Sequence, residues 1–258
     1  MEIVKFTPTS DPFDADHPYL VTAIKPAQKI ENRVNIFIND KYEFSLEIPQ
    51  VIDLRLKVGR RLTVRELNEC RHASEFGKLY HHALEYALMR PHSTKEVIDH
   101  LKNRRTRRET MNRQVAKNRE KSKEEQIRFK LRTKELPLYT DQDIFAVIER
   151  LTEKGYVDDQ KFAKFYVENR NYKKGISKKR LIMDLRKKGL DSDVIENAIS
   201  GSERSDTEEM QKIIAKKSKK YTPEKLVTYL VRQGFDFQQA KAAVYGTDLQ
   251  NSGQNPLW

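Results

Sequence analysis

An internal repeat constrains the fold of this sequence more than any other feature. Residues 177–199 and 222–244 align without a gap at a shift of 45, which matches Gly189 with Gly234. Each copy contains a capping residue, an amphipathic helix, a glycine typical of a helix C-terminus and a second helix. Such a repeat cannot bury its apolar side alone, so neighbouring copies must stack. The sequence therefore predicts a tandem helical array.

An earlier copy of the pattern begins at Ser93, at a shift of 84 residues. Its second helix, 143–151, aligns only if the shift falls to about 51. The difference of 33 residues is the length of a basic segment, 102–134, which we interpret as an insertion in the first repeat. No glycine or proline lies between Pro91 and Pro137, so the insertion can be helical throughout. We expect it to form a projecting hairpin or an extended helix.

A further helix is expected before each helix pair, at 78–89, 159–172 and 208–219. Three three-helix units in tandem result, and their stacking would create an elongated, curved surface. Ahead of the repeats, strand-like runs at 19–24, 33–38 and 42–46 predict a small antiparallel sheet, with Asn39-Asp40 as a turn. Thr63 and Glu66 have the spacing of a capping box at the start of a helix.

The expected fold class is mainly α, with tandem three-helix repeats in an elongated curved array and a small N-terminal β-rich domain. The predicted domains are 1–75, the sheet with a helix; 76–157, the first repeat with the basic helical insertion 102–134; 158–202, the second repeat; 203–250, the third repeat; and 251–258, a polar tail.

Composition narrows the class of protein. The 258 residues are 34% charged and contain nine glycines and nine prolines, which favours helices over a turn-rich β protein. No apolar run is long enough to cross a membrane and the N-terminus lacks a signal-peptide pattern, so we expect a cytoplasmic protein. The single cysteine, Cys70, excludes an internal disulfide and a cysteine-based zinc site.

Positive charge is concentrated in the insertion. Residues 102–134 contain 14 basic and 4 acidic side chains, which accounts for ten of the twelve excess positive charges. Such a block is typical of a protein that binds a polyanion, although a solvated helix is the alternative. The candidate binding residues of this block, the insertion arginines, are Arg104, Arg105, Arg107, Arg108 and Arg113.

A second group of cations breaks a local rule. Ser177 begins a helix whose first turn is Lys178-Lys179-Arg180, and three cations there oppose the helix dipole. Free backbone N–H groups with these side chains would make an anion site for a phosphate or an acidic partner, the alternative being an exposed turn that tolerates charge. The central patch comprises Arg170, Lys173, Lys174, Lys178, Lys179, Arg180, Arg186, Lys187 and Lys188.

Residues that could support catalysis are not arranged for it. The sequence contains neither the Walker spacing nor G-x-G-x-x-G. The histidines His81, His82, His92 and His100 lack a matched ligand spacing, so we expect no metal site. One residue of Asp158-Asp159 is expected to cap a helix, and Cys70 has no neighbouring base. We therefore expect neither an enzyme nor a cofactor.

Three motifs stand out in and beside the repeats: Gly155-Tyr156-Val157-Asp158-Asp159-Gln160-Lys161-Phe162-Ala163, Leu185-Arg186-Lys187-Lys188-Gly189 and Gln233-Gly234-Phe235. Together they resemble the RecX family, regulators of the RecA recombinase. The resemblance covers about residues 78–245, and the N-terminal sheet is similar to the extension of longer members. The basic insertion and the short third repeat with its polar tail depart from the family pattern.

The resemblance implies a non-enzymatic protein that lies in the helical groove of the RecA–DNA filament and inhibits ATP hydrolysis and strand exchange. Separately, we expect a monomer. The central patch would then contact RecA or DNA, and basic patches would contact single- and double-stranded DNA. Two alternatives remain. The chain could be a stand-alone nucleic-acid-binding protein that uses the insertion, or a helical scaffold whose basic helix docks on an acidic partner.

Overall fold

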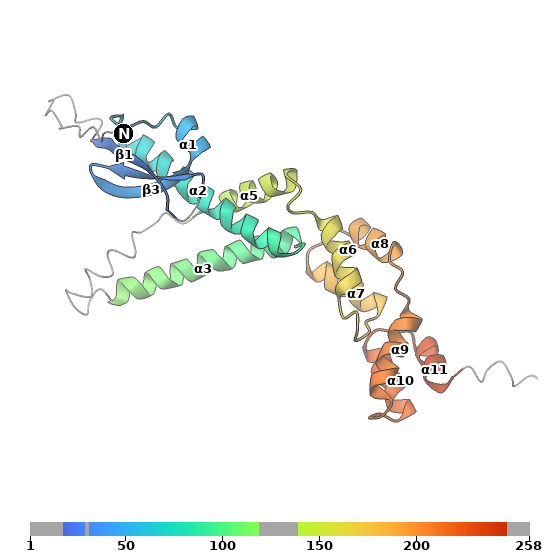
Figure 1. The fold of residues 1–258 in the computed structure, drawn as a ribbon. Coiled ribbons are helices and arrows are strands. Elements are labelled where there is room, and N and C mark those ends of the chain that lie inside the picture. The colour runs from blue at the N-terminus through green and yellow to red at the C-terminus, as the bar shows by residue number, and fades with distance from the viewer. Residues whose placement is uncertain (1–17, 29–30, 119–138, 247–258) are drawn as a thin grey trace, which may run out of the picture. The chain divides into compact units, whose positions relative to one another are not determined.

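The computed structural model describes residues 18–28, 31–118 and 139–246 (Figure 1). The chain divides into two compact units, one built from residues up to 86 together with 98–153, the other from 87–97 and residues after 153. No helix in the described ranges has the length and apolarity needed to cross a membrane.

A four-stranded antiparallel sheet lies at the start of the first unit, in the order β3-β2-β1-β4. Its strands are β1 (Tyr19–Pro26), β2 (Arg33–Ile38), β3 (Lys41–Glu47) and β4 (Arg61–Leu62). Asn39 and Asp40 have φ angles of 48° and 63°, the left-handed values of a two-residue hairpin turn between β2 and β3. The three predicted strands are confirmed, and β4 is an addition to them.

Two helices accompany this sheet, α1 (Ile48–Asp53) and α2 (Val64–Met89). The capping box that begins α2 is confirmed, because the backbone N–H of Thr63 donates to the Glu66 carboxylate at 2.8 Å and the N–H of Glu66 to the Thr63 hydroxyl at 3.2 Å. The helix predicted at 78–89 is the C-terminal part of α2 rather than a separate element.

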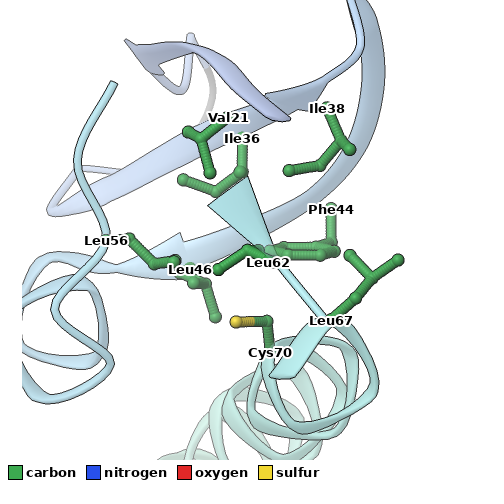
Figure 2. Packing of buried hydrophobic residues seen from close by; sticks show 9 residues of the cluster. All are labelled: Val21, Ile36, Ile38, Phe44, Leu46, Leu56, Leu62, Leu67 and Cys70. Atoms are coloured by element: carbon green, nitrogen blue, oxygen red, sulfur yellow. The ribbon is translucent and has the colours of Figure 1, made fainter. Parts of the chain in front are cut away.

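The sheet and α2 enclose one hydrophobic core. Figure 2 shows Leu67 and Cys70 of α2 beside the strand residues Phe44 and Leu46, and all four side chains are buried. Burial raises the pKa of the Cys70 thiol to about 11, so the thiolate is scarce at neutral pH. Cys70 therefore packs as a small apolar side chain.

The first unit also contains most of α3 (Thr94–Asn118) and α5 (Asp141–Glu153). The hydroxyl of Tyr139 donates to the carbonyl of Leu101 at 2.9 Å, and the Arg150 guanidinium lies 4.8 Å from the centre of the Tyr80 ring. Helix α3 continues unbroken from the first repeat into the predicted insertion, which agrees with a helical start to that segment. Residues 119–138 of the insertion lie outside the described ranges.

The second unit contains two triplets of helices. They are α6 (Asp159–Asn169), α7 (Lys178–Lys187) and α8 (Ser192–Ser200), then α9 (Asp206–Lys217), α10 (Pro223–Arg232) and α11 (Phe237–Tyr245). Each triplet has its own core, and the repeat-matched residues Leu185 and Leu230 are fully buried in them. Gly189 and Gly234 have φ angles of 81° and 95° after α7 and α10, as expected for glycines that end helices. The mainly helical fold with three-helix units and a small N-terminal sheet is confirmed.

Candidate interaction surfaces

The repeated helices of the second unit are linked by matching hydrogen bonds at their N-caps. The Ser93 hydroxyl accepts from the Glu96 N–H and donates to the Lys188 carbonyl at 2.9 Å. The Ser177 hydroxyl likewise accepts from the Arg180 N–H and donates to the carbonyl of Gln233 at 2.7 Å. Each serine therefore caps its own helix and holds the C-terminus of the equivalent helix in the next repeat.

A second hydrogen bond accompanies each serine. The backbone N–H of Thr94 donates to the Asp159 carboxylate, and the N–H of Lys178 donates to that of Asp206, both at 2.8 Å. We call the contacts around Ser93 the first joint and those around Ser177 the second joint. In α10 the equivalent position is Pro223, which has no N–H to offer.

The second joint corrects one expectation. The first turn of α7 was expected to offer free backbone N–H groups to an external anion, but Asp206 occupies that of Lys178 and Ser177 occupies that of Arg180. The physical reason is that a helix N-terminus attracts any nearby carboxylate, and the next repeat supplies one. The central patch can therefore bind through its side chains and not through these N–H groups.

The central patch is largely exposed. Arg170 and Arg180 lie 3.6 Å and 3.8 Å from the Asp184 carboxylate, and Lys188 forms a 2.6 Å ion pair with Glu96. Within the described residues the other cations of the patch have no ion pair; they are Lys173, Lys174, Lys178, Lys179, Arg186 and Lys187. An excess of unpaired cations remains, as a polyanion-binding surface requires.

One exposed face of α7 extends the patch from one end of the helix to the other. Lys179, Met183 and Arg186 are spaced by four and three residues, so they share a face, and all three are exposed. The Met183 side chain is 44% exposed and lies between the two cations. This face can combine electrostatic contact with an apolar one.

A buried ion pair positions the loop that precedes α7. The Arg204 guanidinium forms two bonds to Glu209, of 3.0 Å and 2.7 Å, and also donates to the carbonyls of Val167 and Arg170. The Glu209 carboxylate in turn accepts from the N–H of Ile176 at 2.9 Å. The loop with Arg170, Lys173 and Lys174 is thus held at both ends by the third repeat.

Glu209 stays ionised inside this network. Burial alone would raise the pKa of Glu209, which is 1% exposed, but hydrogen bonds from Arg204, Lys212 and the Ile176 amide outweigh it and lower the pKa. Sequence reasoning missed Arg204 and Glu209. Their spacing of five residues looks like an ordinary surface pair, and no local signal shows that both are buried.

The insertion arginines differ in their surroundings. Arg105 pairs with Asp141 at 2.7 Å and Arg108 with Glu75 at 3.2 Å. Arg104 donates to the His82 ring at 2.7 Å, while Arg107 is exposed and has no ion pair within the described residues. Arg113 lies in α3, and its side chain is outside the described residues.

The remaining titratable candidates have structural partners. Asp158 is the N-cap of α6, as predicted, and accepts from the N–H groups of Gln160 and Lys161, which lower its pKa. His81 pairs with Glu85, and His92 with Glu96. No group of three or more His, Cys, Asp or Glu side chains in the described ranges could hold a metal ion.

Two family models match separate parts of the chain. The RecX N-terminal domain matches residues 19–63, which include the sheet, and the second three-helix domain of RecX matches residues 158–199, which include α6 to α8. These are the regions in which the strand pattern and the repeat were recognised.

Similar proteins extend this likeness over most of the chain. Regulatory protein RecX of Bacillus licheniformis is 29% identical over 242 residues, 91% of this chain and 79% of the relative. That of Bacillus subtilis is 29% identical over 239 residues, 90% of this chain and 78% of the relative. A crystal structure of a regulatory protein RecX has the same fold, with a TM-score of 0.61 and 18% identity over 88% of this chain and 100% of the other. The chain therefore belongs to the RecX family of regulatory proteins.

Proposed function

We propose that this protein binds the RecA–DNA filament and inhibits the ATPase and strand-exchange activities of RecA. Membership of the RecX family supports a regulatory role, and the RecX motifs lie in the segment that contains the central patch. A nucleoprotein filament presents DNA phosphates together with protein side chains, so its partner needs cations on a firmly held backbone.

One observation supports the central patch as the contact surface. The exposed cations of α7 and the loop before it lie on backbone that the second joint and the Arg204–Glu209 pair hold in place. Side chains that are positioned before binding lose less freedom when they bind. The patch therefore combines positive charge with a fixed frame, which suits a regular polyanionic partner.

The test is a charge reversal in the first turn of α7. The K178E/K179E/R180E variant should inhibit RecA ATP hydrolysis at least about tenfold more weakly, because six units of charge change at the contact. The fold should survive, since glutamates suit the start of a helix better than cations. Inhibition is measured as the protein concentration that halves the RecA ATPase rate on single-stranded DNA.

The matched control reverses three exposed lysines of the third repeat, K219E/K220E/K225E, which changes the net charge by the same amount. This control should inhibit RecA nearly as well as the parent protein. Full inhibition by the α7 variant, or an equal loss in both variants, would refute the central patch as the contact. Thermal unfolding followed by circular dichroism verifies that both variants are folded.

A further inference from the structure

A hollow on α3 gathers cations away from the central patch. His100, Asn103, Arg104, Arg107, Arg108 and Met111 line an open cavity of about 340 Å³. His100, Asn103, Arg104, Arg107 and Met111 recur at spacings of three and four, so one side of the helix faces the hollow. No lining residue is acidic. A site with cations on its walls and no carboxylate attracts anions.

The arginines that line the hollow differ in how many of their N–H donors are already used. Arg108 pairs with the buried Glu75 at 3.2 Å, which fixes its position. Arg104 gives one N–H to the His82 ring, and since guanidinium is only a donor, the ring nitrogen must accept. A guanidinium has five N–H donors, so Arg104 and the exposed Arg107 retain a fork of donors for a planar or tetrahedral oxyanion.

A stacked pair of rings fixes the imidazole of His100. The ring of Tyr86 on α2 lies parallel to that of His100, with the ring centres 4.0 Å apart. The His100 side chain is half-buried, and Arg104 and Arg107 lie one and two turns further along the same helix, α3. On α2, the Glu85 carboxylate lies 3.2 Å from His81 and 3.4 Å from His82. An imidazole is thus held rigidly at the wall of a cationic hollow.

We propose that this hollow is a nucleic-acid-binding site that holds a backbone phosphate between Arg104 and Arg107, with His100 as a further donor. The inference goes beyond the RecA contact, because it requires neither RecA nor the central patch. A phosphodiester fits better than a carboxylate, since its oxygens can accept from two guanidinium groups and a ring N–H at once. The hollow is open, as a site on a continuous chain of phosphates must be.

Proton uptake accompanies binding at such a site. Partial burial and the positive charges of Arg104 and Arg107 lower the pKa of His100, and the pKa of His82 is lowered by burial and by Arg104. A bound phosphate reverses the sign of the local field and raises the pKa of His100. The complex then binds more protons than the free protein, so affinity for nucleic acid increases as the pH falls from 8 to 6. The phosphodiester itself does not titrate in this range.

The test measures binding of a fluorescent single-stranded DNA oligonucleotide to the full chain without RecA, by anisotropy, at pH 6 and pH 8. Parent protein should bind at least about twofold more tightly at pH 6 than at pH 8, because the complex takes up a proton on His100. H100Q should bind like the parent at pH 8 and lose most of the pH dependence. R104Q/R107Q should weaken binding about tenfold and reduce the slope of log affinity against log salt by about one to two.

Two controls separate this site from general positive charge. K219Q/K220Q removes two exposed lysines elsewhere and should reduce affinity by less than about twofold. Polyglutamate of equal charge should compete poorly, and equal competition would assign the hollow to an acidic protein instead and refute the nucleic-acid site. Unchanged binding by R104Q/R107Q, or an unchanged pH dependence in H100Q, would also refute it. Because RecA is absent, these results are independent of the ATPase test of the central patch.

Discussion

The two joints use the same backbone contacts but different charged groups. Both have a serine that bridges two helices and an N–H that donates to an aspartate of the next repeat. The second joint adds the buried pair Arg204–Glu209, whereas in the first Glu96 pairs with the buried His92 and with Arg90 and Lys188, whose side chains are 41% and 38% exposed. The two joints thus share the same hydrogen bonds, but their ion pairs differ in burial and therefore in how much they contribute to stability.

This difference has an energetic consequence. An exposed ion pair contributes about 0 to 1 kcal/mol, whereas removing one partner of a buried pair costs about 3 to 5 kcal/mol because the other charge is left uncompensated. The second joint is therefore the more sensitive to substitution. It is also the joint that positions the loop of the central patch.

The largest expected effect is the loss of Glu209. E209A should reduce the free energy of unfolding by about 3 to 5 kcal/mol, because the charge of the buried Arg204 would be left without a compensating carboxylate. The comparable change in the first joint, E96A, should cost less, about 1 to 3 kcal/mol: Arg90 and Lys188 can turn to water, but the buried His92 ring loses the carboxylate 3.0 Å away. Urea unfolding monitored by circular dichroism measures both values.

The control for this prediction is E208A, which removes an exposed carboxylate from the neighbouring position of α9. It should change stability by less than about 0.5 kcal/mol. Equal losses for E209A and E96A would break the comparison between the joints. A double replacement of Arg204 and Glu209 by apolar residues should cost less than E209A alone, since no unpaired charge is left.

An intermediate effect is expected at the two glycines that end α7 and α10. A Cβ at Gly234 would lie 2.8 Å from the hydroxyl oxygen of Ser177, and one at Gly189 would lie 2.9 Å from side-chain carbons of Lys95. Both glycines have positive φ, so alanine adds backbone strain of about 1 kcal/mol in either case. The Ser177 hydroxyl is fixed by two hydrogen bonds, and the Cβ of Lys95, itself 2.9 Å from the added atom, is fixed to its own backbone.

G234A and G189A should therefore each reduce the free energy of unfolding by about 2 to 3 kcal/mol, the sum of backbone strain and a close contact. Thermal and urea unfolding of the two variants are compared with those of G59A. Gly59 has a positive φ but nothing within 4 Å of its added Cβ, so G59A reports strain alone. A smaller loss of stability in G234A than in G59A would contradict this prediction. It would show that the contact between Gly234 and Ser177 can widen without a loss of stability.

The smallest effect is expected for the bridging serines. S177A and S93A should each reduce stability by about 1 kcal/mol, because each removes a helix cap and one bond between repeats. The two losses should agree within about 0.5 kcal/mol, since the serines have the same geometry. Threonine at either position retains the hydroxyl and serves as the control. A difference above about 1 kcal/mol would mean that the two joints are not equivalent even in their hydrogen bonds.

Features that depend on neighbouring residues could be predicted from the sequence. The strands, the repeat, the capping box at Thr63 and the N-cap at Asp158 were all recognised from local spacing. The continuity of α2 was not, because its centre is polar enough to look like a boundary between two helices. Packing against the sheet at one end supplies the stability that its sequence alone does not indicate.

The candidate surfaces were predicted less completely, for a physical reason. Charge density marked both the central patch and the insertion arginines. It could not show that Asp206, 28 residues away, occupies the Lys178 N–H, or that Glu75 and Asp141 pair with two of the insertion arginines. Those contacts form only when distant segments fold together. A local sequence pattern identifies the basic residue but not the acidic residue that pairs with it.

Each joint connects the start of a helix in one repeat to the end of the equivalent helix in the next repeat. Pro223 is the residue of the third repeat that matches Thr94 and Lys178. A contact between the head of one repeat and the tail of the next is heterologous, and such contacts can in principle continue from one molecule to another as an open fibre. A proline at the head of α10 withholds the N–H that the next aspartate would need, and its ring occupies the space of that bond. The first turn of α10 therefore cannot make the backbone contact that Thr94 and Lys178 make at the two joints.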